Sequence, residues 1–467
     1  MNNTRRTRIV ATVGPASDKP AQLDALIGAG ADVFRISASH DSIDVVRTRV
    51  AAVRDAAART GTEVAVMVDL CGPKLRCIPP SEPIELIEGE TWMVVSGLPG
   101  ERPRTLGSTI PSEAWDHIPV GTTLALGDGA VQFQTMARDG DGMLCRVSAN
   151  GILRGRPGLH VPSDLLKMDS PTAEDLKVVE TCMEIDVDAI AVSFVRSAAD
   201  VQRVKELAPG KLIVAKIETA VAVTNLDTVI AAADAVMVAR GDLGLEFPLS
   251  EIPFLQRRII RAATAAARPV ITATQMLESM VSAKVPTRAE AADVANAILD
   301  GTSAVMLSGE TAIGVNPEAA VRTMAEFAAR ADQDVVPRTE LPLPLTGDSI
   351  TAPVTHAVSE AAHRVAYQTG AVAVVGLTDS GFTARALSRW RSPLPLIAAT
   401  RSERTVRQLR FSWGVSAIRV KSAETDDVLV ELVTANVLPP DAPVVVVSGV
   451  PGGRASDTVR VRRTPSH

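Results

Sequence analysis

Eight short apolar runs, each rich in Val, Ile or Ala, occur before residue 310 and constrain the fold most strongly. They cover residues 8–13, 32–36, 63–68, 188–192, 211–217, 235–239, 269–274 and 302–307. Most are separated by amphipathic, Ala-rich stretches of helical spacing, such as 253–267 and 289–299. Strands that alternate with helices form a parallel sheet, and eight such units close into a barrel. The sequence therefore predicts an α/β chain built on a (β/α)8 TIM barrel.

One strand-to-helix connection is far longer than the others. Between residues 72 and 163 the chain carries Gly- and Pro-rich turn signals and short β-rich pieces, among them 92–95, 123–126 and 143–147. Loops of this length without secondary structure are uncommon. We therefore expect a small inserted β-barrel domain, placed as a lid over the barrel mouth, and a catalytic barrel formed by residues 1–71 and 164–336.

The chain beyond the barrel differs in composition. Residues 337–353 are rich in Pro, Thr and Gly and are predicted to be a linker. The apolar runs and helical stretches that follow alternate over 356–368, 371–375, 384–390, 426–435 and 442–448. This alternation predicts a separate open α/β domain over residues 354–467.

Composition narrows the class of protein. The chain has 467 residues, 46% hydrophobic but only 3% aromatic, so a large core must consist of aliphatic side chains, as in barrel interiors. A net charge of −6 with dispersed Lys and Arg argues against nucleic acid as a partner. No signal pattern or membrane-length apolar run is evident, and the four cysteines lack metal-site spacing. We expect a cytoplasmic protein with reduced thiols and no membrane partner.

The polar residues at the strand ends indicate the chemistry. The sixth run ends in Arg240-Gly241-Asp242, and the fifth carries Lys216 and is followed by Glu218. A barrel brings these ends together at one mouth. Two carboxylates suit Mg²⁺ or Mn²⁺ bound jointly with substrate oxygens, and a lysine beside such a metal suits a phosphoryl group. The alternative is a structural ion-pair network among the same charged residues.

Other strand ends add candidate ligands for an anion. These are Arg35, Ser37, Ser39, His40, Arg76, Thr274 and Ser308. Paired arginines at one mouth suit phosphate oxygens, although a single arginine is more often a solvated surface residue. Hydroxyls at strand ends are common, so each of them is weak evidence when taken alone.

Several longer motifs resemble blocks of the pyruvate kinase family. They are TRIVATVGPAS at 7–17, MVARGDLG at 237–244, VITATQMLESM at 270–280, PTRAE at 286–290, DVANAILDG at 293–301 and AVMLSGET at 304–311. The likeness covers almost the whole barrel, and motifs this long in this order are highly specific. The inserted domain and the C-terminal domain agree with the family's architecture, although their sequences match only loosely.

The resemblance implies an enzyme that converts phosphoenolpyruvate and ADP into pyruvate and ATP. It assigns Glu218 and Asp242 to the divalent metal, Lys216 to the transferring phosphoryl group and Arg35 to phosphate. It further implies that Thr274, with the backbone N–H groups of Gly241 and Asp242, holds the substrate carboxylate. Thr274 and Ser308 would lie where the enolate is protonated, and His40 and Arg76 would lie on the nucleotide side.

The chain departs from the family pattern around the monovalent-cation site. Ser37 stands where the family usually has an Asn that ligates the ion, Leu70 replaces a Thr beside Asp69, and Lys74 replaces a Glu. The corresponding group here is Ser37, Ser39, Asp69, Leu70 and Lys74. A lysine at this position is similar to the pattern of the family's potassium-independent branch. Its ammonium can supply the positive charge of the ion and would repel a second cation. We therefore expect that potassium is not required.

A second departure concerns the nucleotide. Pro157 stands where the family usually has a lysine that contacts the nucleotide, and His160 stands where it has Asn. The resemblance therefore leaves open a diverged enzyme that acts on another enol phosphate or another nucleotide acceptor. A non-catalytic relative is a third reading, against which the intact set of Lys216, Glu218, Asp242 and Thr274 argues.

The C-terminal domain carries a candidate regulatory loop. Thr378, Ser380 and Thr383 precede a predicted helix, and hydroxyls at a helix start can hold a phosphate. The loop resembles the family's effector loop, which implies a sugar-phosphate or nucleotide effector; the alternative is a plain strand–helix turn. The resemblance also implies a homotetramer.

Overall fold

The computed structural model describes residues 5–39, 42–127, 129, 131–166, 168–341, 351–449 and 456–466. Eight parallel strands close into a barrel in the order β1-β2-β3-β12-β13-β14-β15-β16. They are β1 (Arg8–Thr12), β2 (Val33–Ser37), β3 (Ala65–Asp69), β12 (Ala189–Val192), β13 (Leu212–Ile217), β14 (Ala235–Ala239), β15 (Val270–Ala273) and β16 (Ala304–Leu307). The predicted (β/α)8 barrel is confirmed.

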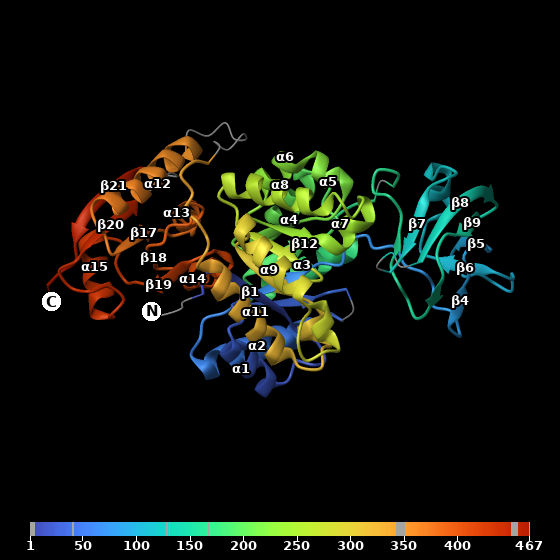
Figure 1. Cartoon of the computed structure of the whole chain (residues 1–467), viewed down its shortest axis with the longest axis horizontal. Helices are drawn as coiled ribbons and strands as arrows, with labels where there is room; N and C mark the ends of the chain where they lie inside the picture. Colours follow the sequence, from blue (N-terminus) through green and yellow to red (C-terminus); the bar gives the residue numbers. More distant parts are fainter. Residues whose placement is uncertain are drawn as a thin grey trace.

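Helices cover the outside of the barrel (Figure 1). They are α1 (Pro20–Ala29), α2 (Ile43–Thr60), α3 (Ala173–Glu184), α4 (Ala198–Leu207), α5 (Ala220–Thr224), α6 (Leu226–Ala232), α7 (Arg240–Glu246), α8 (Ile252–Ala265), the 3-10 turn η2 (Glu278–Val281), α9 (Arg288–Asp300), α10 (Gly309–Ala312) and α11 (Pro317–Asp332). Thr172 and Thr287 begin α3 and α9 with reciprocal capping boxes. Gly301 ends α9 in the left-handed conformation that glycine adopts without steric cost.

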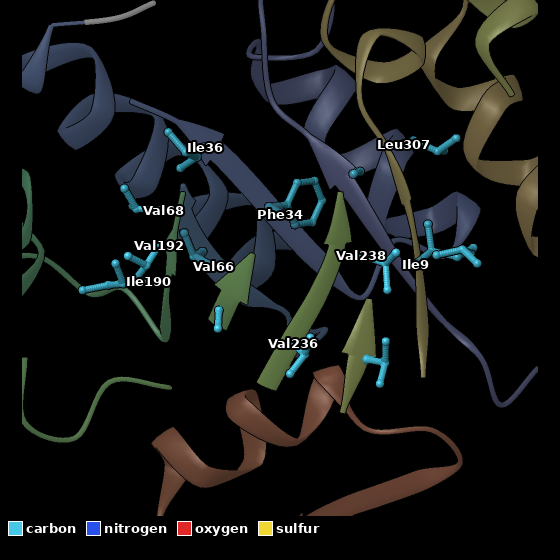
Figure 2. Packing of buried hydrophobic residues seen from close by; sticks show 14 of the residues in the cluster. Ile9, Phe34, Ile36, Val66, Val68, Ile190, Val192, Val236, Val238 and Leu307 are labelled. Atoms are coloured by element: carbon cyan, nitrogen blue, oxygen red, sulfur yellow. The ribbon is translucent and has the colours of Figure 1, made fainter. Parts of the chain in front are cut away.

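Both faces of the barrel strands are buried. Phe34, Ile36, Val66 and Val68 point outward and pack under the helices (Figure 2). Alternate residues such as Met67 point inward and belong to the cluster that fills the barrel. Near-continuous apolar strands are typical of parallel sheets, because both faces are covered. The aliphatic core predicted from the low aromatic content is therefore observed.

The inserted segment is all-β, as predicted, but its strands form two sheets instead of one small closed barrel. A six-stranded sheet has the order β11-β7-β8-β9-β5-β6, and β10 pairs with β4 separately. The elements are β4 (Ile84–Leu86), β5 (Thr91–Ser96), β6 (Thr105–Ser108), the 3-10 turn η1 (Ser112–His117), β7 (Thr123–Leu126), β8 (Val131–Asp139), β9 (Gly142–Val147), β10 (Gly151–Leu153) and β11 (Leu159–His160). The segment has its own core around Trp115 and Phe133. It is attached beside the barrel, on the side away from the C-terminal domain (Figure 1).

The C-terminal domain is an α/β sheet with strand order β19-β18-β17-β20-β21, in which only β21 is antiparallel to its neighbour. Its elements are α12 (Thr351–Gln368), β17 (Ala373–Leu377), α13 (Phe382–Ser388), β18 (Leu396–Thr400), α14 (Glu403–Gln408), the 3-10 turn η3 (Leu409–Phe411), β19 (Val415–Arg419), α15 (Thr425–Thr434), β20 (Pro443–Ser448) and β21 (Thr458–Arg463). Of the predicted linker 337–353, residues 342–350 lie outside the described residues. No helix among the described residues is long and apolar enough to cross a membrane.

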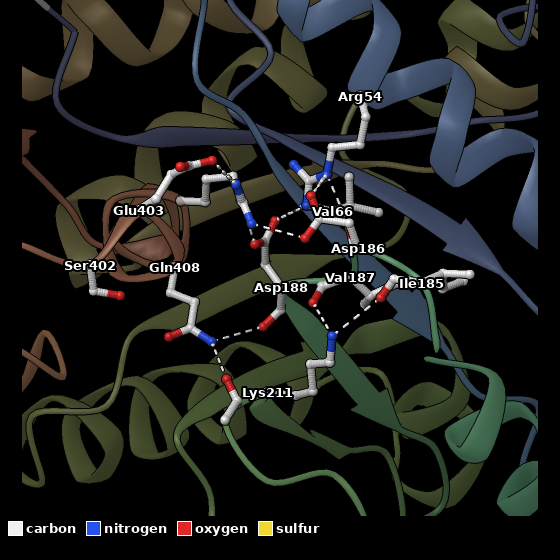
Figure 3. Close-up of polar contacts among 12 residues, drawn as sticks. Arg54, Val66, Ile185, Asp186, Val187, Asp188, Lys211, Ser402, Glu403 and Gln408 are labelled. Atoms are coloured by element: carbon white, nitrogen blue, oxygen red, sulfur yellow. Dashed lines mark hydrogen bonds and ion pairs between the residues drawn. The ribbon is translucent and has the colours of Figure 1, made fainter. Parts of the chain in front are cut away.

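The C-terminal domain docks on the barrel end where the strands begin. Phe411 is fully buried and belongs to the cluster inside the barrel. Beside it, the Asp188 carboxylate, just before β12, accepts from Arg407 Nε at 2.8 Å and from the Val66 N–H at 2.8 Å. Arg54 completes this network, and Gln408 donates to the Asp188 carbonyl (Figure 3). The opposite end of the barrel is thereby left as the mouth.

Candidate active site

Predicted polar side chains from six strand ends line one cavity of about 320 Å³ at the mouth. They are Arg35 on β2, Asp69 on β3, Lys216 on β13, Asp242 in α7 after β14, Thr274 after β15 and Ser308 after β16. The inserted segment supplies other parts of the wall, including Lys74, Arg76 and Gly158. These predicted site residues therefore meet where the inserted segment joins the barrel, although Glu218 is not among the residues that line the cavity.

Lys216 is the centre of a charge network. Its Nζ lies 3.3 Å from Asp69 Oδ1 and 3.4 Å from Glu218 Oε2, and donates to Ser193 Oγ at 2.7 Å. Arg35 Nε donates to Asp69 Oδ2 at 2.7 Å. Burial alone would lower the pKa of Lys216, but Asp69 and Glu218 outweigh burial and raise that pKa. Lys216 is therefore a fixed positive charge on the cavity wall.

Glu218 is buried and only half satisfied. Its Oε1 accepts the Phe194 N–H at 2.6 Å, while its Oε2 receives no hydrogen bond from any residue that the structure describes. Burial raises the pKa of Glu218 to about 7; Lys216 opposes this rise and Asp242 adds to it. A buried carboxylate oxygen without a donor, influenced by a second carboxylate, fits a hard cation.

Asp242 lies at the start of α7 and meets Lys74 Nζ at 3.5 Å. Within the described ranges, no three His, Cys, Asp or Glu side chains form a complete metal site. A divalent ion at Glu218 and Asp242 would therefore complete its shell with substrate and water oxygens, as Mg²⁺ commonly does. The donor set fits such an ion in combination with an anionic substrate.

Thr274 has a strained backbone that its neighbours hold in place. Its φ is +68°, a left-handed value that is costly for a β-branched residue. Arg240 Nη2 donates to the Thr274 carbonyl at 2.6 Å while Arg240 Nη1 pairs with Asp293 at 2.7 Å. The Gly241 N–H, predicted to face the substrate, donates instead to Thr274 Oγ1 at 2.8 Å. The Gly241 N–H is therefore engaged within the protein, and of these two residues it is Thr274 that lines the cavity.

Ser308 presents a hydroxyl to the cavity. Its N–H donates to Glu310 Oε2 at 2.7 Å, which fixes the backbone. Its Oγ is buried and has no hydrogen-bond partner among the described residues. Such a hydroxyl is available to a substrate or a water molecule.

The residues predicted for the cation and nucleotide side are only partly brought together. Ser37 and Ser39 line the cavity, as does Arg76, whose Nη1 reaches the Arg156 carbonyl at 3.4 Å. Leu70 is instead part of the apolar core, so its side chain offers nothing to a ligand. His40 lies outside the described residues.

Sequence reasoning missed two side chains of the cavity wall that carry a hydroxyl or a thiol group. Ser193 accepts from Lys216 and donates to the Leu70 carbonyl at 2.7 Å, so it orients the lysine. Cys71 also lines the cavity. Their position at strand ends could have identified them, because Ser193 directly follows β12 and Cys71 follows β3 by two residues.

The candidate regulatory loop is a tight turn into α13. Thr378 Oγ1 accepts the Gly381 N–H at 2.9 Å, and Thr383 Oγ1 is buried against Ser456 Oγ at 2.7 Å. Ser380 is exposed. Of the three predicted hydroxyls, Thr378 and Thr383 are therefore already engaged within the protein.

Comparison with known proteins agrees with this geometry. Family models described as "Pyruvate kinase, barrel domain" and "Pyruvate kinase, alpha/beta domain" match residues 4–321 and 356–462. A pyruvate kinase of Agrobacterium vitis is 37% identical, with 99% of both chains covered. One from Mycobacterium tuberculosis is 37% identical, with 97% of both chains covered.

A solved structure shares the complete architecture. The crystal structure of a pyruvate kinase from Cryptosporidium parvum superposes with a TM-score of 0.86 at 29% identity, covering 99% of this chain and 96% of that one. Because both family models and relatives of nearly equal length agree with the strand-end chemistry, the chain is a phosphotransferase that belongs to the pyruvate kinase family.

Proposed function

We propose that the protein transfers the phosphoryl group of phosphoenolpyruvate to ADP, using Mg²⁺ or Mn²⁺ held by Glu218 and Asp242, and that it needs no potassium. The observation that carries the metal site is Glu218 Oε2, buried without a hydrogen-bond donor among the described residues and 3.4 Å from Lys216. When bound, a divalent ion would neutralise charge on the phosphoryl oxygens.

The residues at the mouth account for the remaining needs of the reaction. Lys216 and Arg35 contact the phosphoryl oxygens while the bond from phosphorus to the enol oxygen breaks and a bond to a β-phosphate oxygen of ADP forms. Thr274 and the Asp242 N–H hold the substrate carboxylate, while the Gly241 N–H donates to Thr274 Oγ1. The enolate then takes a proton at its methylene carbon, from a water that Thr274 and Ser308 orient, and becomes pyruvate.

The metal assignment is tested by titrating Mn²⁺ in the presence of phosphoenolpyruvate. Glu218→Gln and Asp242→Asn should each weaken Mn²⁺ binding, and turnover with phosphoenolpyruvate, ADP and Mg²⁺ should fall with it. If the titration curves of both variants equal that of the wild type, the two carboxylates do not share a metal ion.

The potassium proposal rests on Lys74, which lines the cavity and meets Asp242 at 3.5 Å. Its ammonium is a resident cation at the mouth, and a second monovalent cation beside it would be repelled. Turnover should therefore be equal in tetramethylammonium and potassium buffers of matched ionic strength. Activation by potassium above about tenfold, or roughly 1.4 kcal/mol, would contradict the proposal.

A diverged specificity is the second candidate. Pro157 lies on the cavity wall and offers no cation, while its exposed neighbour Arg156 also lines the cavity. Measuring kcat/KM across nucleoside diphosphates and across enol phosphates separates the two candidates. Preference for another enol phosphate or acceptor by more than about tenfold would favour the diverged enzyme.

Three expectations stay predictions. Residues 72–163 should act as a lid, so scattering should show compaction when phosphoenolpyruvate, nucleotide and Mg²⁺ are added. An effector phosphate at Thr378, Ser380 and Thr383 should raise the melting temperature in the presence of sugar phosphates or nucleotides. A homotetramer should elute at four times the mass of one chain.

A further inference from the structure

The chain that returns from the inserted segment is fastened to the barrel by one buried carboxylate, Glu246. Its Oε1 accepts the Ser163 N–H at 3.0 Å, and its Oε2 accepts the Ser163 hydroxyl at 2.8 Å and the Ala220 N–H at 3.2 Å. The Glu246 side chain is only 3% exposed, and His160 Nε2 lies 3.6 Å away. Three donors on two separate segments therefore converge on one side chain.

The position of Glu246 in the chain links these segments to both candidate metal ligands. Glu246 is the last residue of α7 and Asp242 lies one turn earlier, so the two project from the same face of the helix. Ala220 follows Glu218 by two residues and begins α5. Glu246 thus holds α7 against the segment that carries Glu218, and Ser163 joins the inserted segment to both.

The junction encloses a small cavity that has one lining residue in common with the large cavity at the mouth. Glu246, His160, Ser163 and Arg196 line a cavity of about 70 Å³ between the inserted segment and the barrel. Asp242 lines this cavity and also the large one at the mouth. Arg196 Nη1 fastens the same returning chain by donating to the Ser163 carbonyl at 2.7 Å. A shift of the inserted segment therefore reaches Asp242 through Glu246.

We propose that Glu246 is a positioning residue: it sets the spacing of Glu218 and Asp242 and transmits the position of the inserted segment to them. The inference rests on the proposed metal site. The carboxylate is required because all three groups that it accepts are donors. A glutamine would turn its amide NH₂ toward either the Ser163 N–H or the Ala220 N–H, neither of which can accept a hydrogen bond.

Glu290 provides a matched control. Its carboxylate accepts the Ser279 N–H at 2.7 Å, the Ser279 hydroxyl at 2.6 Å and the Thr287 N–H at 2.7 Å. These donors are of the same kinds as at Glu246, a serine hydroxyl and two backbone N–H groups, and the Thr287 hydroxyl adds a fourth at 2.9 Å. Glu290 lines neither cavity and lies at the start of α9. Glu290→Gln therefore reproduces the local loss without touching the proposed link.

The experiment compares Mn²⁺ binding to the full chain, measured from the free-ion paramagnetic resonance signal without substrate. Glu246→Gln should weaken Mn²⁺ binding about 10-fold to 100-fold, as loss of a group that orients a ligand does. Glu290→Gln should leave it within about twofold, although both variants should lose thermal stability, Glu246→Gln the more because its carboxylate is more deeply buried. Ser163→Ala, which keeps the backbone donors, should weaken binding about two- to fivefold, and it decides the question if Glu246→Gln does not fold.

Two results would overturn the inference. Equal Mn²⁺ affinity for the wild type and for Glu246→Gln, or for the wild type and a folded Ser163→Ala, would show that the junction does not set the ligand spacing. An equal loss in Glu290→Gln would show that the effect is a general consequence of lost stability. If Asp242→Asn also binds like the wild type, the proposed metal site itself fails, and the inference with it.

Discussion

At both ends of the barrel, carboxylates lie beside cationic side chains. The two ends differ in how many of the carboxylate oxygens accept a hydrogen bond. At the end where the strands begin, three aspartates each precede a strand and accept a backbone N–H from the neighbouring strand. The pairs are Asp32 with Ile9, Asp188 with Val66 and Asp234 with Ile213. Arg8, Arg407 and Lys205 are among the side chains that take up their other oxygens. At the mouth, Glu218 keeps one oxygen without a donor from any described residue.

This difference separates structural from functional charge networks. A carboxylate whose oxygens are all paired can be exchanged only at a cost in stability, and it has nothing left for a ligand. A buried carboxylate with one oxygen that accepts no hydrogen bond is costly until a ligand arrives. The location of Asp188 before its strand, and of Glu218 after its strand, indicates which kind each is.

We call the paired carboxylates Asp32, Asp188 and Asp234, at the end where the strands begin, the closed network. The largest expected effect concerns this network. Asp188→Asn leaves Arg54 and Arg407 without their shared buried counter-charge, so the free energy of unfolding should fall by about 3–5 kcal/mol. The kcat of the folded enzyme should stay within about twofold. Denaturant unfolding and a coupled assay measure the two quantities.

Asp186→Asn is the control, because Asp186 contacts the same two arginines but its side chain is 57% exposed. Asp186→Asn should lower the free energy of unfolding by no more than about 1 kcal/mol. Equal losses in the two variants would mean that burial of the Asp188 pair does not matter.

The next effect concerns the open network, which is the group of Lys216, Glu218 and Asp69 at the mouth. Lys216→Met should lower kcat about 10²–10³-fold and change KM much less, because the lysine acts on charge that develops in the transition state. Circular dichroism should show an intact fold. Lys211→Met is the comparison from the other end of the same strand, where Lys211 Nζ binds the Val187 carbonyl at 2.8 Å. A similar loss of kcat in Lys211→Met would erase the distinction between the two ends.

A smaller effect is expected at the pair of Lys74 with Asp242. Lys74→Glu removes the resident cation, so turnover should become activated by potassium by about tenfold or less, since Leu70 and Ser37 offer poor replacements for the usual ligands. Lys205→Glu changes the corresponding Lys–Asp pair at the other end, where Lys205 meets Asp234 at 2.7 Å. That variant should lose stability but show no response to potassium.

The smallest effect is a dependence of stability on pH. Burial opposes ionisation of Asp32, but Arg5, Arg8 and the Ile9 N–H outweigh it and lower its pKa. A carboxylate with a lowered folded pKa stabilises the protein above its unfolded pKa, near 3.9, and loses this contribution as pH falls through the folded value. The slope of stability against pH below about pH 4 should be shallower in Asp32→Asn, by at most about 1.4 kcal/mol per pH unit. Identical slopes would remove Asp32 from the closed network.

The barrel and most of the mouth could be predicted because short, continuous stretches of the sequence determine both. Alternating apolar runs specify strands whose ends share one face, so Lys216, Asp242 and Thr274 were found from their positions after those runs. Two features could not be found in this way. Leu70 directly follows a strand, yet it turns into the core. The clamp that Arg240 forms on Thr274 depends on a contact between segments 34 residues apart.

Features that join domains were the least predictable. Glu246 reads as an ordinary helix residue, and its three donors come from two distant segments. The inserted segment was recognised as β-rich, but its division into two sheets depends on which strands pair, and short strands leave that pairing weakly specified. Sequence periodicity defines elements, whereas partners across domains are defined only by the assembled fold.

Phe411 has a consequence for how the chain matures. Its ring fills the end of the barrel, but it is made 104 residues after the last barrel strand ends, since β16 ends at Leu307 and 411 − 307 = 104. At a synthesis rate of about 5–20 residues per second, a nascent barrel waits roughly 5–20 s on the ribosome with this end uncovered. Early release of the chain would leave an apolar opening, so the barrel's own core is complete only once the C-terminal domain has been made.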